Sequence, residues 1–297
     1  MFPFLFYLPL SLSPPLILAG CTMSVLGIVS NCFRTQLTAG ARLTDLIIEA
    51  VQHGYRVIEL RQTCLGEFES GDEPMPLPES LTVLSETFPG VRFNVAIAVP
   101  FLEADFLADD DVFTAGKWAA HAVAGEYPPQ LRLVDPSTST LAESPQSAGH
   151  RIARLTREMI ELDGILSVEH SRQPWCEFRA AFDAARGDLA LEGNRLRLCY
   201  DPCNLLIPDN GVDPAQITTS LKPEELSMVH AKQRSGGPLH TVTTGDIDWA
   251  AQADALKQIG YGGPILFEIE PHADIWINLE ASRRYLQDAG FDNIPLK

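Results

Sequence analysis

Short apolar segments rich in β-branched residues alternate with longer amphipathic segments from residue 24 onward. The apolar segments begin roughly every 30 to 40 residues, a spacing typical of a strand followed by a helix and two loops. Eight such segments predict strands: 25–30, 56–60, 92–98, 131–135, 165–169, 195–201, 226–230 and 265–270. The fourth rests on the least evidence, because residues 105–149 show little periodicity.

The segments between the predicted strands have helical periodicity. Apolar residues recur three and four positions apart in 41–54, 148–164, 175–187, 248–260 and 278–290. Glycine closes these segments, as at Gly54 and Gly260, and glycine is typical of a helix C-terminus. Alternating strands and helices with no break in composition predict one α/β domain over residues 23–297, a closed (β/α)₈ TIM barrel.

An open doubly wound sheet is the alternative fold. Such a sheet commonly carries a glycine-rich phosphate loop after its first strand. The corresponding stretch, residues 29–40 (VSNCFRTQLTAG), lacks the Gly-x-Gly-x-x-Gly spacing. The closed barrel is therefore the preferred prediction.

Residues 1–22 are predicted to be a non-core N-terminal extension. They are apolar and end in Leu-Ala-Gly-Cys, which resembles a lipoprotein cleavage site at Cys21. However, no Lys or Arg precedes the apolar run, and four prolines interrupt it. We interpret the segment as a misassigned start or a signal-like sequence, and we expect a cytoplasmic protein without stable membrane association.

Charge and cysteine content narrow the function. The chain has 39 acidic and 22 basic residues and a net charge of −17, which disfavours binding to nucleic acid. We expect a small-molecule substrate, while the sequence leaves a homo-oligomer open. The six cysteines form no Cys-x-x-Cys pair, so they are predicted to be reduced thiols rather than disulfides or a thiolate zinc site.

Metal-binding side chains follow four consecutive predicted strands. Glu169, Asp201 and His230 end three of them, and Glu268 lies in the last one. In a barrel the C-terminal strand ends converge, so three acids would repel one another unless a cation neutralised them. Alone, each acid is a common loop or cap residue and the histidine a common core residue. Together they predict a site for Mn²⁺, Mg²⁺ or Co²⁺, with Zn²⁺ as a further option.

The segments SVEHS, YDPCN, MVHAKQ, GDIDW and LFEIE, in this order, resemble the xylose isomerase-like TIM barrel superfamily. That group includes sugar phosphate isomerases and epimerases, ketose 3-epimerases, inosose dehydratases and endonuclease IV enzymes. The resemblance implies that the four residues above are metal ligands and that Glu169 and Glu268 are also the catalytic base and acid. Lys232, two residues beyond His230, is expected to point the same way along the strand edge, as a polarising group or proton donor or else as a solvated rim lysine. Glu59, Arg61, Asn204 and Arg234 are further candidates for substrate contacts.

The chain departs from the superfamily pattern at two places. Many members have histidine at the position of Asn204, and asparagine cannot exchange a proton near neutral pH. The endonuclease branch needs further histidines on strands 2 and 3, where this chain has Glu59-Leu60-Arg61 and Asn94-Val95-Ala96. A three-zinc cluster therefore cannot be assembled, and together with the net charge of −17 this argues strongly against DNA repair.

The resemblance implies a metal-dependent sugar or sugar phosphate isomerase or epimerase that works through an enediolate. A dehydratase or lyase acting on an inosose or keto-sugar is one alternative, and a non-catalytic sugar-binding barrel is another. His170 alternates with Glu169 along the strand and so is predicted to be structural. Asp246 and Asp248 are expected to fix their loop and to cap the following helix.

Overall fold

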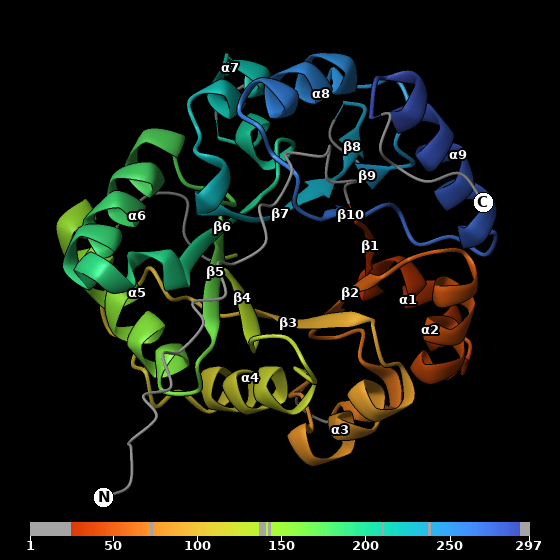
Figure 1. Ribbon diagram of the computed structural model, residues 1–297, viewed down its shortest axis with the longest axis horizontal. Coiled ribbons are helices and arrows are strands. Elements are labelled where there is room, and N and C mark those ends of the chain that lie inside the picture. The colour runs from red at the N-terminus through yellow and green to blue at the C-terminus, as the bar shows by residue number, and fades with distance from the viewer. Residues whose placement is uncertain are drawn as a thin grey trace, which may run out of the picture.

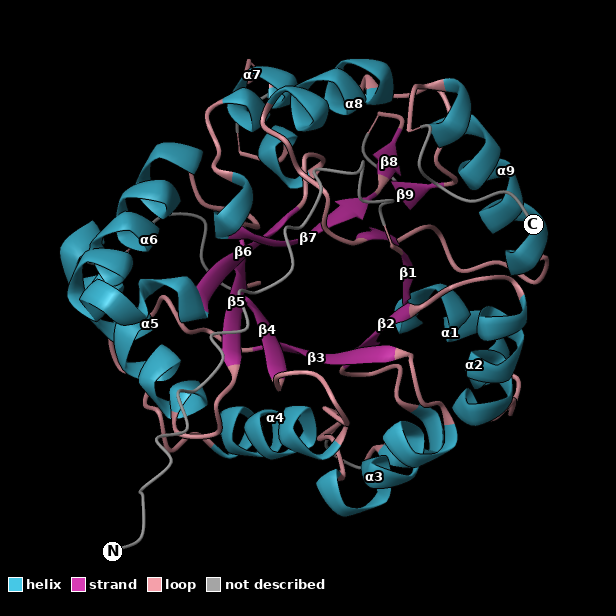
Figure 2. Cartoon of the chain, in the orientation of Figure 1, coloured by secondary structure: helices cyan, strands magenta, loops and turns pink. Residues whose placement is uncertain are grey.

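The computed structural model describes residues 25–71, 74–136, 141, 144–208, 211–236 and 239–291. The predicted extension at residues 1–22 lies outside these ranges. Within them, a central ring of parallel strands is surrounded by an outer ring of helices (Figures 1 and 2). Each strand is followed along the chain by helical segments that return on the outside of the ring.

The strand ring is closed. In the described chain it consists of β1 (Leu26–Val29), β2 (Val57–Arg61), β3 (Arg92–Ala98), β4 (Gln130–Val134), β5 (Ile165–Glu169), β6 (Leu196–Tyr200), β7 (Leu226–Ala231) and β10 (Ile265–Phe267). β1 pairs in parallel with β2 on one side and with β10 on the other. This closure confirms the predicted TIM barrel and excludes the open sheet.

All eight predicted apolar segments contain a barrel strand, but the two strands predicted to contain Asp201 and Glu268 end before these residues. β10 ends at Phe267, although the amide of Glu268 still donates to the carbonyl of Ala231 at 3.1 Å. β6 ends at Tyr200, and Asp201 begins a turn. Asp201 and Glu268 therefore stand one residue past their strands, at the C-terminal rim of the barrel.

The five predicted helices are confirmed, with ends shifted by a few residues. The described helices are α1 (Arg34–Thr38), α2 (Leu43–Gln52), α3 (Pro78–Thr87), α4 (Asp111–Ala122), α5 (Pro145–Ile160), α6 (Trp175–Leu189), α7 (Pro214–Thr219), α8 (Trp249–Gln258) and α9 (Ile275–Asp288). None of them is long and apolar enough to cross a membrane. The short hairpin of β8 (Gln233–Arg234) and β9 (Leu239–His240) follows β7.

Two glycines allow close packing that a side chain would prevent. A Cβ atom on Gly27 in β1 would lie 2.8 Å from the carbonyl oxygen of Val57 and 2.7 Å from Cγ of Leu266. On Gly149 in α5 it would lie 2.9 Å from the carbonyl oxygen of Ala181 in α6. Glycine is thus required where β1 fits between its neighbours and where α5 crosses α6.

Candidate metal centre and active site

The four predicted ligands meet at the C-terminal rim. β5, β6, β7 and β10 are consecutive in the barrel, so the residues at their ends are neighbours in space. One ligand atom from each of Glu169, Asp201, His230 and Glu268 lies within 4.8 Å of the others, and all four residues are buried. The barrel geometry thus gathers residues that are far apart in the sequence.

Asp201 serves the turn and the cluster with different oxygens. Its Oδ1 accepts hydrogen bonds from the amides of Cys203 at 2.9 Å and Asn204 at 3.4 Å. Its Oδ2 lies in the cluster, 2.7 Å from Nζ of Lys232. The turn that follows β6 therefore fixes the orientation of the carboxylate.

Each glutamate of the cluster is oriented by a side-chain amide. Nδ2 of Asn204 donates to Oε1 of Glu169 at 2.9 Å and also to the carbonyl of His170 at 2.9 Å. Nδ2 of Asn31, which follows β1, donates to Oε1 of Glu268 at 2.9 Å. Asn204, predicted as a substrate contact, is placed as a neighbour of Glu169, and Asn31 was missed by the sequence analysis.

Lys232 brings a positive charge into the cluster. Its Nζ lies 2.7 Å from Oδ2 of Asp201 and 2.9 Å from Oε2 of Glu268. Burial opposes the charged form, but these two carboxylates outweigh it and raise the pKa of Lys232. The ammonium therefore stays charged near neutral pH, which suits polarising an oxygen better than donating a proton.

A second polar layer lies directly beneath the rim. The guanidinium of Arg132, in β4, lies with Nη2 2.6 Å from Oε1 of Glu59 and with Nη1 2.6 Å from Oε2 of Glu169. His230 joins the layers: its Nδ1 is 3.1 Å from Oε2 of Glu268, and its Nε2 is 3.4 Å from Oε1 of Glu59. Burial raises the pKa of Glu59, but Arg132 and His230 outweigh it and hold that pKa at about 2.

The donor set fits a divalent cation. Oδ2 of Asp201, Nδ1 of His230 and Oε2 of Glu268 are buried and converge, and their near partners are charged or ionisable groups of the cluster itself, with Nζ of Lys232 at 2.7 Å from Oδ2 and at 2.9 Å from Oε2. Oxygen donors with one imidazole suit Mn²⁺, Mg²⁺, Co²⁺ or Zn²⁺. The charge of the buried groups also favours a bound cation. Four carboxylates and two cationic side chains leave two negative charges when His230 is neutral. These groups are Glu59, Glu169, Asp201, Glu268, Arg132 and Lys232.

A second donor group, Glu59, Cys199 and His230, does not suit a metal. Their ligand atoms also lie within 4.8 Å of one another. However, Arg132 already contacts the carboxylate of Glu59 at 2.6 Å. Burial also raises the pKa of Cys199 to about 12, so its thiol stays protonated. These residues therefore form the layer behind the rim.

The other predicted residues lie around the mouth. Arg61, half-buried at the end of β2, donates from Nη1 to the carbonyl of Gln62 at 3.4 Å. Arg234 lines a cavity of about 790 Å³ with Cys203 and Asp246. This cavity lies beside the turn that holds Asp201, where the distal part of a substrate could extend.

The residues predicted to be structural have structural contacts. Nε2 of His170 lies 2.6 Å from the carbonyl of Gln173. Oδ1 of Asp246 accepts from the amide of Gly236 at 3.4 Å, and Asp248 caps α8 by accepting from the amides of Ala250 and Ala251. These three expectations are confirmed.

Arg132 and Asn31 are the main residues that the sequence analysis missed. Arg132 is a charged residue in the middle of an apolar strand segment, LRLV, and Glu59 is the same in VIEL. A positive residue in one apolar strand and a negative residue in another indicate a buried ion pair, so the sequence did contain a sign of it. Asn31 stands in a polar turn with no comparable signal.

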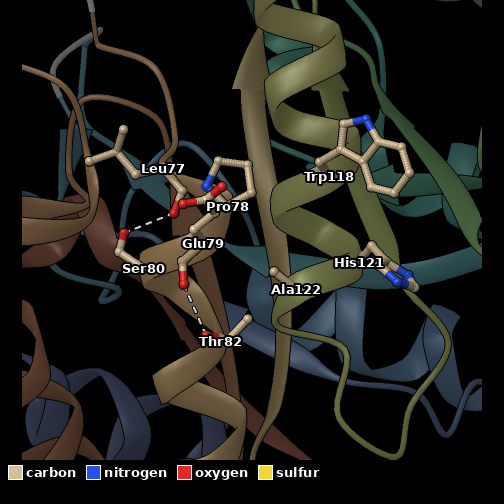
Figure 3. A pocket seen from close by; sticks show the side chains of 8 residues that line it. All are labelled: Leu77, Pro78, Glu79, Ser80, Thr82, Trp118, His121 and Ala122. Atoms are coloured by element: carbon tan, nitrogen blue, oxygen red, sulfur yellow. Dashed lines mark hydrogen bonds between the residues drawn. The ribbon is translucent and has the colours of Figure 1, made fainter.

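A separate depression lies on the outside of the barrel (Figure 3). It has a volume of about 700 Å³ and lies between Leu77 and Pro78 at the start of α3 and Trp118 and His121 on α4. Its lining is mostly apolar, and none of its lining residues belongs to the rim cluster. The chemistry of the described chain is thus concentrated at the mouth.

Comparisons with known proteins agree with the barrel fold. Residues 157–291 match the family model described as xylose isomerase-like TIM barrel, and no curated protein matches the chain. The IolI protein with a bound zinc atom is 16% identical, with a TM-score of 0.64 over 91% of this chain and 98% of that chain. A sugar phosphate isomerase/epimerase from Parabacteroides distasonis is 13% identical, with a TM-score of 0.60 over 96% and 99%.

The probable 3-DHS dehydratase AsbF from Bacillus anthracis is also similar, with 15% identity and a TM-score of 0.62 over 89% of this chain and 99% of that chain. At these identities the structural likeness establishes the fold alone. The family-model match over residues 157–291 confirms the predicted resemblance to xylose isomerase-like barrels for that part of the chain.

Proposed function

We propose that this xylose isomerase-like barrel is a divalent-metal-dependent isomerase or epimerase of a sugar or sugar phosphate. The observation that carries the proposal is the buried rim cluster, in which ligand atoms of Glu169, Asp201, His230 and Glu268 converge within 4.8 Å. A bound divalent cation would supply Lewis-acid stabilisation of negative charge on substrate oxygens. The two unbalanced negative charges of the cluster support this assignment.

The protein groups would handle the proton. Glu169 and Glu268 enter the cluster from β5 and from the end of β10, with His230 between them on β7. Two carboxylates on different sides of a bound sugar can remove a proton next to a carbonyl and return it to the other carbon or the other face. Lys232 would polarise the oxygen on which charge develops in the enediolate.

Asn204 and Asn31 would keep the two carboxylates in place during this transfer. Each amide donates to one oxygen of its glutamate, so the other oxygen keeps a fixed direction. Arg234 and Arg61, which lie around the mouth, would contact hydroxyl or phosphate oxygens of the substrate. The cavity beside Arg234 has room for the distal carbons of such a molecule.

A dehydratase is the second candidate, because a probable dehydratase shares the fold with a TM-score between those of the two other neighbours described above. Both reactions begin with loss of a proton next to a carbonyl. They differ in the fate of the enediolate, which is either reprotonated or expels a β-hydroxyl group. Product mass therefore separates them.

The test uses purified protein stripped with chelator and reloaded with Mn²⁺, Mg²⁺, Co²⁺ or Zn²⁺. It is incubated in D₂O with panels of ketoses, ketose phosphates and inososes. An isomerase or epimerase incorporates deuterium next to the carbonyl without losing water, whereas a dehydratase releases one water. Absence of exchange with every substrate and metal would leave only a binding role.

Glu169→Gln and Glu268→Gln should abolish the exchange. The matched control is Glu225→Gln, because Glu225 is also a buried glutamate paired with arginine, at 2.8 Å from Nη1 of Arg179, but it precedes β7 at the opposite end of the barrel. This control should keep its exchange activity. Equal loss in all three variants would point to a folding effect.

A further inference from the structure

The layer beneath the rim has no role in the chemistry proposed above. It contains a fully buried glutamate, Glu59, and a buried arginine, Arg132, which are 2.6 Å apart. A buried ion pair costs desolvation energy that its Coulomb attraction only partly returns, so stability alone does not account for it well. Its contacts with the rim residues indicate what it does.

His230 presents its two ring nitrogens to different layers. Nδ1 faces the rim, 3.1 Å from Oε2 of Glu268 and 3.8 Å from Oε1 of Glu169. Nε2 faces inward, 3.4 Å from Oε1 of Glu59 and 3.3 Å from Sγ of Cys199. A neutral imidazole that offers Nδ1 to a cation must carry its proton on Nε2, and that proton needs an acceptor.

Glu59 is the acceptor with a full negative charge on that side, since the thiol of Cys199 is neutral and a weak acceptor. Arg132 fixes Glu59 in turn, and its other Nη holds Glu169 at 2.6 Å. The guanidinium is planar and rigid, so one side chain sets the relative positions of a rim carboxylate and of the group behind the rim imidazole.

We propose that Glu59, held by Arg132, is a positioning residue that orients His230 so that Nδ1 faces the metal site. This inference rests on the proposed metal-dependent function. It assigns Glu59 a place behind the ligands, in place of the substrate contact expected from the sequence. Full burial of its carboxylate supports this, because a substrate at the mouth would have to reach past His230.

The experiment measures Zn²⁺ affinity by competition with a chromophoric chelator, using the full-length protein. Carboxylates behind a ligating histidine typically contribute about 10- to 100-fold to metal affinity. We expect Glu59→Gln to weaken Zn²⁺ binding by about that factor, and Glu59→Asp to recover part of the loss. Glu225→Gln is the control, because it also removes an ion pair between arginine and a buried glutamate but should bind Zn²⁺ as wild type does.

A second measurement reads the imidazole directly. In Zn²⁺-loaded wild-type protein labelled with ¹⁵N-histidine, the His230 signal, assigned by its absence in His230→Gln, should show a metal-bound Nδ1 and a protonated Nε2. Coordination through Nε2 would overturn the inference. So would unchanged affinity in Glu59→Gln, or an equal loss in Glu225→Gln.

The outcomes for the two proposals are distinguishable. Failure of the wild-type protein to bind Zn²⁺ or Mn²⁺ would overturn the metal-dependent function, and the positioning role with it. Tight binding by the wild type together with tight binding by Glu59→Gln would overturn the positioning role alone.

Discussion

Replacing Arg132 with methionine tests how strongly the barrel interior depends on its buried cation. Arg132→Met keeps an unbranched apolar side chain of similar reach but removes the charge. Glu59 and Glu169 each lie 2.6 Å from the guanidinium, so both buried carboxylates would lose the positive charge of Arg132. Removal of one partner from a buried ion pair typically destabilises a protein by about 3–5 kcal/mol.

Two comparisons give this number meaning. Arg284→Met removes an exposed pair with Glu280, at 3.0 Å, and should cost about 1 kcal/mol or less. The double variant Arg132→Met/Glu59→Gln also removes the buried negative charge of Glu59, which Arg132 no longer neutralises. It should be more stable than Arg132→Met by at least roughly 1 kcal/mol, because residues in one network couple by about that much.

The assay is urea unfolding followed by far-UV circular dichroism, in chelator so that metal binding does not contribute. A change in midpoint at constant slope reports stability. Arg132→Met within about 1 kcal/mol of wild type would refute the reasoning, because the buried carboxylates would then have no need of Arg132. A double variant less stable than Arg132→Met would refute the charge argument.

Two further predictions concern the outer ring. Glu67 accepts from the amides of Leu43 and Thr44 at the start of α2, which lowers its pKa although partial burial opposes this. Its contribution is therefore present above its ordinary pKa and lost as pH falls through the lowered one. Glu67→Gln should cost roughly 1 kcal/mol at pH 7 and progressively less toward pH 3, and a constant difference across this range would contradict the assignment. Gly149→Ala should destabilise the protein by about 1–3 kcal/mol, although alanine has the better helix propensity. Gly187→Ala, where nothing lies within 4 Å of the added Cβ, should be neutral or stabilising. Equal unfolding midpoints for the two variants would contradict the packing argument.

The fold could be predicted from the sequence because each barrel strand is buried on both sides and reads as a short apolar run. The segment around Ile165–Glu169 and the amphipathic α5 and α6 are clear examples. α3 was not among the predicted helices, and α4 lies within residues 105–149, where periodicity is weak. Tertiary packing defines α4, where Asp110 caps the helix and Gly116 lies so close to β3 that an added Cβ atom would be 2.8 Å from Cδ1 of Ile97.

The rim cluster was predictable because the C-terminal ends of consecutive barrel strands must converge. The contacts among its members were not. Whether Asn204 reaches a substrate or donates to Glu169 depends on the turn after Asp201, and sequence does not reveal that geometry. The pairing of Glu59 with Arg132 joins β2 and β4, which lie on either side of β3, so it depends on the strand order and register of the folded sheet.

The most direct test of the metal site is equilibrium dialysis against Mn²⁺ followed by elemental analysis of the dialysed protein. The structure places one group of converging rim donors, so wild-type protein should retain about one Mn²⁺ per chain. His230→Gln, which removes the imidazole while the fold is checked by circular dichroism, should retain roughly a tenth of that or less. Wild-type protein without bound Mn²⁺, or equal retention by His230→Gln, would contradict the account.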